Sequence, residues 1–276
     1  MDDSYLANLT LIKLVEASKR GVKVVLLVDD VNIKLNQSLQ RELEQAGGII
    51  HPLNNIQNYI MNLNFSRDVF RRHHEKVAII DSTGFIGSAN IADSYGGYIY
   101  GENDFYDLNT VMKNVCLSQI RKAICDTVGF YGLRLDHTLS NEEILNKYNE
   151  LYQDSLFSTG NTYLIRSIPP KVQEIQKFLI DQISNAKKSI RIIQPYYYKI
   201  PAFENAIIGA LDRGVHVEIV TAHKRDQPVY SSLKNMLLMG NMISKGLKVY
   251  EFHDRLLHMK TYLFDDELYT LGKCFF

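Results

Sequence analysis

Apolar and polar positions along the chain form blocks of a helix, a short turn and a buried strand. In residues 11–29, apolar side chains recur at helical spacing, an Arg-Gly pair follows, and an apolar run completes the block. Residues 203–221 repeat this order in the same register. Gly21 and Gly214 stand where a helix ends in a left-handed cap, which glycine adopts without steric cost.

Two further blocks recur in the same order. A helix-turn-strand pattern is expected in residues 39–53 and again in residues 233–252. Residues 73–81 and 257–265 then carry similar mixtures of histidine, lysine and apolar side chains. Three matched blocks in one order predict an internal duplication.

The predicted fold class is α/β, with two similar halves about a pseudo-twofold axis, each a mixed sheet flanked by helices. The first half is expected to span residues 1–155 and the second residues 156–276, with the polar stretch 153–162 as linker. Residues 109–132 and 141–152 are expected to be helical.

One part of the second half has no counterpart in the first. A helix near 171–187 and a strand at 189–196 precede the repeated blocks of the second half, whereas only 19 residues precede Arg20. The first half is therefore expected to lack its N-terminal strand, and the second half its C-terminal part.

Composition is that of an ordinary globular protein, with 46% hydrophobic and 22% charged residues. The 31 basic and 31 acidic residues balance, which disfavours nucleic acid as a partner because such binding draws on a basic excess. Three cysteines without metal-ligand spacing indicate reduced thiols. No apolar run approaches the length of about 18 residues that a transmembrane helix needs, and Met1-Asp2-Asp3 is unlike a signal peptide.

Both halves contain the pattern His-x-Lys-x-x-x-x-Asp. Its members are His74, Lys76 and Asp81 in the first half, and His258, Lys260 and Asp265 in the second. Side chains two apart on a strand share a face, so each histidine is expected to point the same way as its lysine. The aspartates have the opposite parity and are expected to brace the base of the strand.

Two imidazoles with two ammonium groups suit the chemistry of a phosphodiester. One imidazole attacks phosphorus, and the other, protonated, gives a proton to the departing oxygen. The lysines neutralise charge on the non-bridging oxygens. This hypothesis requires both imidazoles to face one phosphate.

Ser88 and Asn90 follow the first motif and are also two residues apart. They are expected to face the phosphate together, with Gly87 allowing close approach. The alternative is a polar edge of a β-hairpin.

These residues resemble the phospholipase D superfamily, whose hallmark is the paired motif, and within it the cardiolipin synthases of the phospholipase D type. The resemblance rests on HHEKVAIIDSTGFIGSANIADSYGG, FYDLNTVMK, IRIIQPYYYKIP, DRGVHVEIVTAHKRD and LLHMKTYLFDDELYTLG. It covers residues 11 to 272 and implies a duplicated phospholipase D-like fold.

The resemblance also implies roles for single residues. It implies a covalent phosphohistidine, with His74 as nucleophile and His258 as acid and then base, although the assignment can be exchanged. Asp107 matches an acidic residue that orients a motif histidine, Arg72 matches a basic phosphate or headgroup contact, and Tyr196 is a candidate substrate contact. No metal and no cofactor are implied.

Departures from the family pattern surround the second motif. Gly272-Lys273-Cys274-Phe275 stands where the family has Gly-Ser-x-Asn, and no acidic residue follows downstream to orient His258. His253 is interpreted as incidental and His223 as part of a solvated loop.

Three functions remain open. The first is a phosphatidyltransferase acting on a phosphatidylglycerol-like substrate at a membrane surface that faces a reducing compartment, the bacterial cytoplasmic membrane or the mitochondrial inner membrane. The second is a hydrolytic phosphodiesterase of lipid or nucleic acid, which differs only in its acceptor. The third is a catalytically impaired structural member of a membrane assembly, whose protein partners are unknown.

Overall fold

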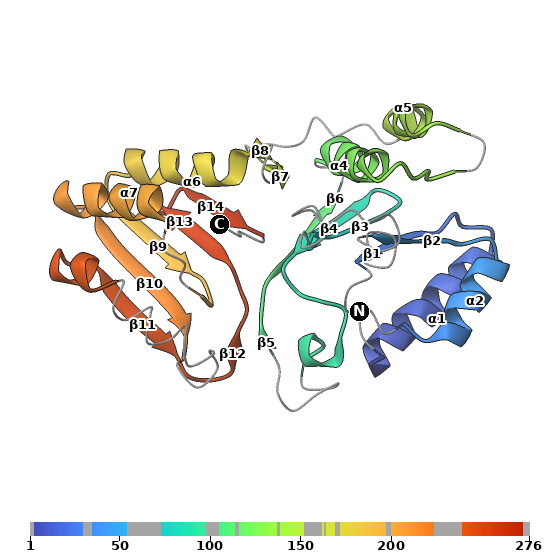
Figure 1. The fold of residues 1–276 in the computed structure, drawn as a ribbon, viewed down its shortest axis with the longest axis horizontal. Coiled ribbons are helices and arrows are strands. Elements are labelled where there is room, and N and C mark those ends of the chain that lie inside the picture. Colours follow the sequence, from blue (N-terminus) through green and yellow to red (C-terminus); the bar gives the residue numbers. More distant parts are fainter. Residues whose placement is uncertain are drawn as a thin grey trace, which may run out of the picture. The chain divides into compact units, whose positions relative to one another are not determined.

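Alternating helices and strands build an α/β protein in the computed structural model (Figure 1). The residues that the structure describes are 3–29, 35–53, 73–97, 105–113, 116–136, 139–151, 162, 164–168, 172–196, 200–223 and 239–272. The alternation of helices and strands confirms the predicted α/β class.

The helices in chain order are α1 (Tyr5–Lys19), α2 (Gln37–Gln45), the 3-10 helix η3 (Asp93–Tyr95), α4 (Leu117–Phe130), α5 (Asn141–Leu151), α6 (Glu174–Asn185) and α7 (Pro201–Asp212). Residues 239–244 are also helical. Within the described ranges, none of the helices combines the length and the apolar character needed to cross a bilayer.

The strands are β1 (Val25–Asp29), β2 (Ile49–Leu53), β3 (Lys76–Ile80), β4 (Thr83–Gly87), β5 (Phe105–Tyr106), β6 (Asn109–Lys113), β7 (Ser167–Ile168), β8 (Val172–Gln173), β9 (Ser189–Ile193), β10 (His216–Ala222), β11 (Lys248–Phe252), β12 (Leu256–Leu257), β13 (Thr261–Phe264) and β14 (Leu268–Leu271). Short β7 and β8 pair with each other in antiparallel fashion.

The chain divides into two compact units, but a single cut does not separate them. One unit holds residues 1–84, 90–102 and 112–162, and the other holds residues 85–89, 103–111 and 163–276. Two short segments of the first half of the sequence therefore group with the second half.

The second unit is built on a mixed five-stranded sheet in the order β11-β10-β9-β13-β14. Strand β10 is parallel to β9 and β11, whereas β13 is antiparallel to β9 and β14. Helices α6 and α7 run side by side over this sheet (Figure 1). Ile190, Ile207 and Tyr262 are fully buried in the resulting core, and the Tyr262 hydroxyl donates to Gln194 Oε1 at 2.6 Å.

The repeated blocks of the sequence correspond to repeated elements. Gly21 and Gly214 end α1 and α7 with φ angles of 85° and 82°, and Val22 N and Val215 N donate back to carbonyls of the last helical turn. The parallel pair β1-β2 matches the parallel pair β10-β11. The expected position of the helix caps and of the strands after them is confirmed.

The strands of the first half form separate sheets because none of the described strands there takes the place that β9 has in the second unit. In the second unit, β9 lies between β10 and β13. Among the described residues, no first-half strand corresponds to β9, and β1-β2 is a sheet apart from β3-β4-β6. Without a bridging strand, the two parts of the sheet have no shared partner for their backbone groups.

The prediction of one helix over residues 109–132 is wrong at its start. Residues 109–113 form β6, with exposed and half-buried side chains in alternation, and α4 begins only at Leu117. Cys116 precedes α4 with a φ of 56°, which no helix interior tolerates. The helix expected over 141–152 is confirmed as α5.

Candidate active site

A pair of two-residue strands brings Asp107 and His258 to the same place. Strand β5 is parallel to β12, with Phe105 opposite Leu256 and Tyr106 opposite Leu257. Asp107 and His258 are the next residues of the two strands. The Tyr106 carbonyl fixes this register because it accepts from His258 N at 2.9 Å and from Met259 N at 3.0 Å.

The side chains of Ser88, Asp107 and His258 form a hydrogen-bonded chain. His258 Nδ1 lies 2.6 Å from Asp107 Oδ2, and the Ser88 hydroxyl donates to Asp107 Oδ1. Ser88 is buried, and the Asp107 and His258 side chains are only 5% and 15% exposed. The Phe105 ring meets the imidazole edge-on, with ring centroids 5.6 Å apart. The buried carboxylate thus fixes the orientation of the imidazole through Nδ1. Nε2 is then the ring nitrogen that would transfer a proton to or from a substrate.

The Asp107 carboxylate is stabilised in its charged form. Burial would raise the pKa of Asp107, but hydrogen bonds from His258, Ser88 and the Leu108 amide, with the charge of His258, hold the pKa below its ordinary value. The carboxylate is therefore ionised at neutral pH and accepts the hydrogen bond that the Nδ1–H group donates.

This lowered pKa predicts a pH-dependent contribution to stability. A carboxyl group with a lower pKa in the folded state stabilises the fold above its unfolded pKa of about 3.9, and loses this contribution as pH falls through the folded-state pKa. The Asp107→Asn variant is expected to be less stable than the parent by about 1–3 kcal/mol near neutral pH. Urea unfolding should show this difference shrinking as the pH is lowered from about 5 through the folded-state pKa; a constant difference would contradict the assignment.

His74 and Lys76 also lie together, as their spacing predicts. Lys76 Nζ is 2.5 Å from His74 Nδ1 and 3.1 Å from the His74 carbonyl. An ammonium group only donates, so this ring nitrogen accepts. The first-motif imidazole has an ammonium neighbour where His258 has a carboxylate.

Lys260 and the motif aspartates stabilise local backbone. Lys260 is buried and donates to the His258 carbonyl. Asp265 accepts from the backbone amides of Lys187, Lys188 and Ser189, which lower its pKa, so it holds the start of β9. It does so from the turn after β13, which ends at Phe264, and not from a position on an unbroken strand. Asp81 and Asp265 occupy turns with φ angles of 51° and 53°, a conformation that aspartate tolerates better than most residues.

The remaining predicted site residues are Ser88, Asn90, Tyr196 and Arg72. The Ser88 hydroxyl is bound to Asp107, and Asn90 Nδ2 donates to Tyr95 Oη at 3.0 Å. Tyr196 is half-buried just after β9. Arg72 lies outside the described residues, as does the segment 273–276 that departs from the family pattern.

Two arrangements in the structure go beyond what the sequence specified. Asp107 was expected to orient a motif histidine, and in the structure this histidine is His258 of the second motif. The sequence also showed no metal-ligand spacing, whereas the fold gathers His223, Glu251 and His253. Both arrangements depend on strand pairing between distant segments.

Gly87 packs against Asn109 beside this site. A Cβ atom at Gly87 would lie 2.9 Å from the Asn109 Cα and closer still to its side chain, whose Oδ1 accepts from Ala89 N. We expect Gly87→Ala to lower the free energy of unfolding by about 1–3 kcal/mol. Gly129→Ala is the control, because no atom lies within 4 Å of its Cβ in α4 and alanine favours a helix. Equal stability of the two variants in urea would refute this packing.

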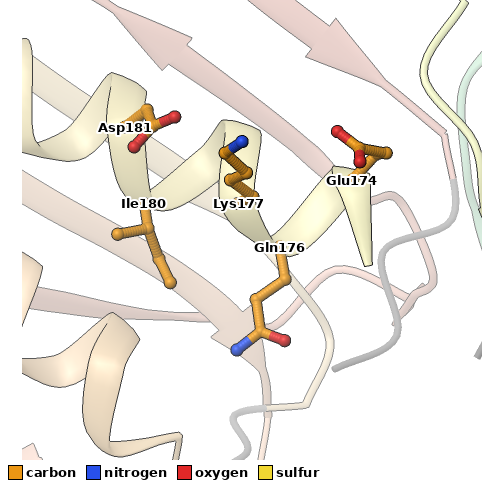
Figure 2. Close-up of a pocket in the computed structure, with 5 residues that line it drawn as sticks. All are labelled: Glu174, Gln176, Lys177, Ile180 and Asp181. Atoms are coloured by element: carbon orange, nitrogen blue, oxygen red, sulfur yellow. The ribbon is translucent and has the colours of Figure 1, made fainter. Parts of the chain in front are cut away.

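A hollow along α6 carries no comparable chemistry. Glu174, Gln176, Lys177, Ile180 and Asp181 line it. Figure 2 shows Gln176 and Ile180 extending to one side of the helix. The lining has exposed charges but no histidine, so the hydrogen-bonded chain at His258 is the stronger candidate.

Comparison with known proteins identifies the family of this chain. The family model described as "Cardiolipin synthase, PLD-like domain" matches residues 5–111 and 179–274. The chain is 28% identical over 269 residues to cardiolipin synthase 2 of Staphylococcus epidermidis, covering 94% of this chain and 51% of that protein. It is 28% identical over 281 residues to cardiolipin synthase of Staphylococcus aureus, covering 99% of this chain and 53% of that protein. The chain thus spans about half the length of these curated relatives.

A solved structure shows the same fold. The phosphatidylserine synthase of Haemophilus influenzae matches 94% of this chain and 74% of its own, with a TM-score of 0.53 and 17% identity. The duplicated α/β fold and the paired motif define a phospholipase D-like protein. The chain belongs to the family of cardiolipin synthase, phospholipase D-like domains.

Proposed function

We propose that this chain carries the active site of a phosphatidyltransferase that exchanges phospholipid phosphodiesters, with phosphatidylglycerol as the donor. The observation that carries the proposal is the buried chain Ser88–Asp107–His258 in a member of the cardiolipin synthase family. An imidazole oriented by a carboxylate is suited to repeated proton transfer.

His74 is the proposed nucleophile. Its attack on phosphorus forms a phosphohistidine bond and breaks the bond to the leaving glycerol oxygen. Lys76 beside the ring supports this role, because its positive charge attracts the anionic phosphodiester. For the attack, the Lys76 ammonium moves from His74 Nδ1 to a phosphate oxygen, which frees the ring lone pair.

His258 is the proposed acid and base. The leaving alkoxide takes a proton from His258 Nε2, and the incoming alcohol later returns a proton to it. Asp107 supports this role because it holds the tautomer with the proton on Nδ1 and stabilises the imidazolium form. Ser88 holds the carboxylate, and Lys260 holds the backbone of His258.

The remaining site roles are proposed by position in the family motif. Arg72, Asn90 and Tyr196 are proposed to contact the phosphate, headgroup or acyl chain. The reaction is proposed to take place at a membrane surface and to need no metal. The proposed division into a first half of residues 1–155 and a second of 156–276 places one motif in each.

The test is product analysis with phosphatidylglycerol in mixed micelles. Mass spectrometry should detect cardiolipin and glycerol in the presence of a chelator, and added alcohol should be incorporated into a new phosphatidyl ester. His74→Ala should abolish all products, whereas the exposed-histidine control His216→Ala should not. If phosphatidic acid is the only product, even with excess alcohol, the reaction is hydrolysis and not transfer. If no product forms with any acceptor, the proposal is refuted.

A further inference from the structure

Three potential metal ligands gather at the ends of two neighbouring strands, in a place that the proposed reaction does not use. His223 follows β10, while Glu251 lies in β11 and His253 just after it. Their ligand atoms all lie within 4.8 Å of one another.

Strand register explains why these residues meet. Strands β10 and β11 are parallel, with Thr221 opposite Glu251 and Ala222 opposite Phe252. Continuing the register by one residue places His223 opposite His253. Glu251 and His253 are two apart, so they share the same side of the chain. Three side chains therefore converge where the two strands end.

The spacing of the atoms fits a tetrahedral ion. Bonds of about 2.0–2.2 Å to zinc place neighbouring ligand atoms about 3.3–3.6 Å apart. Glu251 Oε2 lies 3.5 Å from His223 Nε2 and 3.9 Å from His253 Nε2. These two of the three distances between ligand atoms need only small side-chain movements to reach tetrahedral geometry.

Burial and charge also favour a cation here. The His223 side chain is 8% exposed, whereas Glu251 and His253 reach solvent. The two imidazole rings lie with centroids 4.2 Å apart. Two imidazoles and one carboxylate at this spacing offer three ligand atoms to a divalent cation.

We propose that His223, Glu251 and His253 bind one Zn²⁺ ion, with water as the fourth ligand. Two imidazoles and a carboxylate are a ligand set that zinc favours, with one position left open. The ion fastens the end of β10 to the end of β11. This site is distinct from the histidines of the proposed transfer reaction.

Zinc binding to the full chain tests the proposal by competition with a chromophoric indicator. We expect one equivalent of Zn²⁺, with affinity reduced at least about 100-fold in His253→Ala, because even losing a residue that only supports a ligand costs about 10–100-fold. His253 is exposed, so this variant should fold, and Glu251→Gln should give the same loss. The matched control is His216→Ala, which removes an imidazole paired with Glu218 on β10.

Co²⁺ substitution separates this site from binding by thiols. The proposed ligands should give visible absorption bands of tetrahedral cobalt without the intense thiolate-to-cobalt band in the near ultraviolet. Unchanged zinc affinity in His253→Ala, or a thiolate band from the bound cobalt, would overturn the proposal. Because the proposed transfer reaction is measured with chelator present, failure of either proposal leaves the other intact.

Discussion

The His258→Ala variant is expected to transfer phosphatidyl groups from phosphatidylglycerol at least about 10³-fold more slowly than the parent. A positioned acid–base side chain contributes about 10²–10⁴-fold, and His258 serves in both halves of the proposed reaction. The hydrogen bond to Asp107 shows that this imidazole is held in one orientation. The measurement is the initial rate of phosphatidyl transfer at saturating lipid.

His216→Ala is the control for His258→Ala. His216 is exposed and paired with Glu218 at 2.9 Å, so its loss removes a histidine without touching the site. Circular dichroism and urea unfolding must show that both variants fold. A folded His258→Ala variant with the parent's rate would remove His258 from the mechanism.

Asp107→Asn is expected to lower the same rate by about 10²–10⁴-fold while leaving the lipid KM nearly unchanged. Asparagine keeps the size of the side chain, but its amide can donate to Nδ1 and stabilise the tautomer with the proton on Nε2. A carboxylate that only supported the fold would change stability without this selective loss of kcat. Steady-state kinetics on mixed micelles separate kcat from KM.

Asp126→Asn is the matched control for Asp107→Asn. Asp126 forms an exposed ion pair with Lys122 on α4, and such pairs contribute little to stability. The kcat of Ser88→Ala should fall between the values of these two variants, because this substitution removes only one of the hydrogen bonds that hold Asp107. If Asp107→Asn keeps the parent's kcat, the proposed orienting role is wrong.

Local patterns were sufficient to predict much of the fold. The caps at Gly21 and Gly214 and the strands after them follow from apolar spacing and from the conformational freedom of glycine. His74 and Lys76 also lie together, as their spacing predicts, although His74 precedes β3, which begins at Lys76. These features depend on neighbours in sequence, which the sequence states directly.

Contacts between distant segments were beyond such patterns. Strands β5 and β12 have two residues each, too short for a periodic signal, yet their pairing brings Asp107 to His258. The family resemblance indicated that Asp107 orients a motif histidine, but no local pattern identified His258 as that histidine. The cluster at His223 similarly depends on the register of β10 and β11.

Residues 109–113 show a different limit. Their pattern is compatible with a helix, and only pairing in the sheet β3-β4-β6 makes them a strand. Tertiary context overrides local propensity in such short segments.

The most direct test of the central claim, that two histidines divide nucleophilic and acid–base work, uses a phosphatidyl ester of p-nitrophenol. This leaving group needs no acid, so His258→Ala should release about one equivalent of nitrophenolate and then stop, with mass spectrometry locating a phosphatidyl group on His74. His74→Ala should give no burst and no adduct. A burst that survives loss of His74, or an adduct on another residue, would contradict the account.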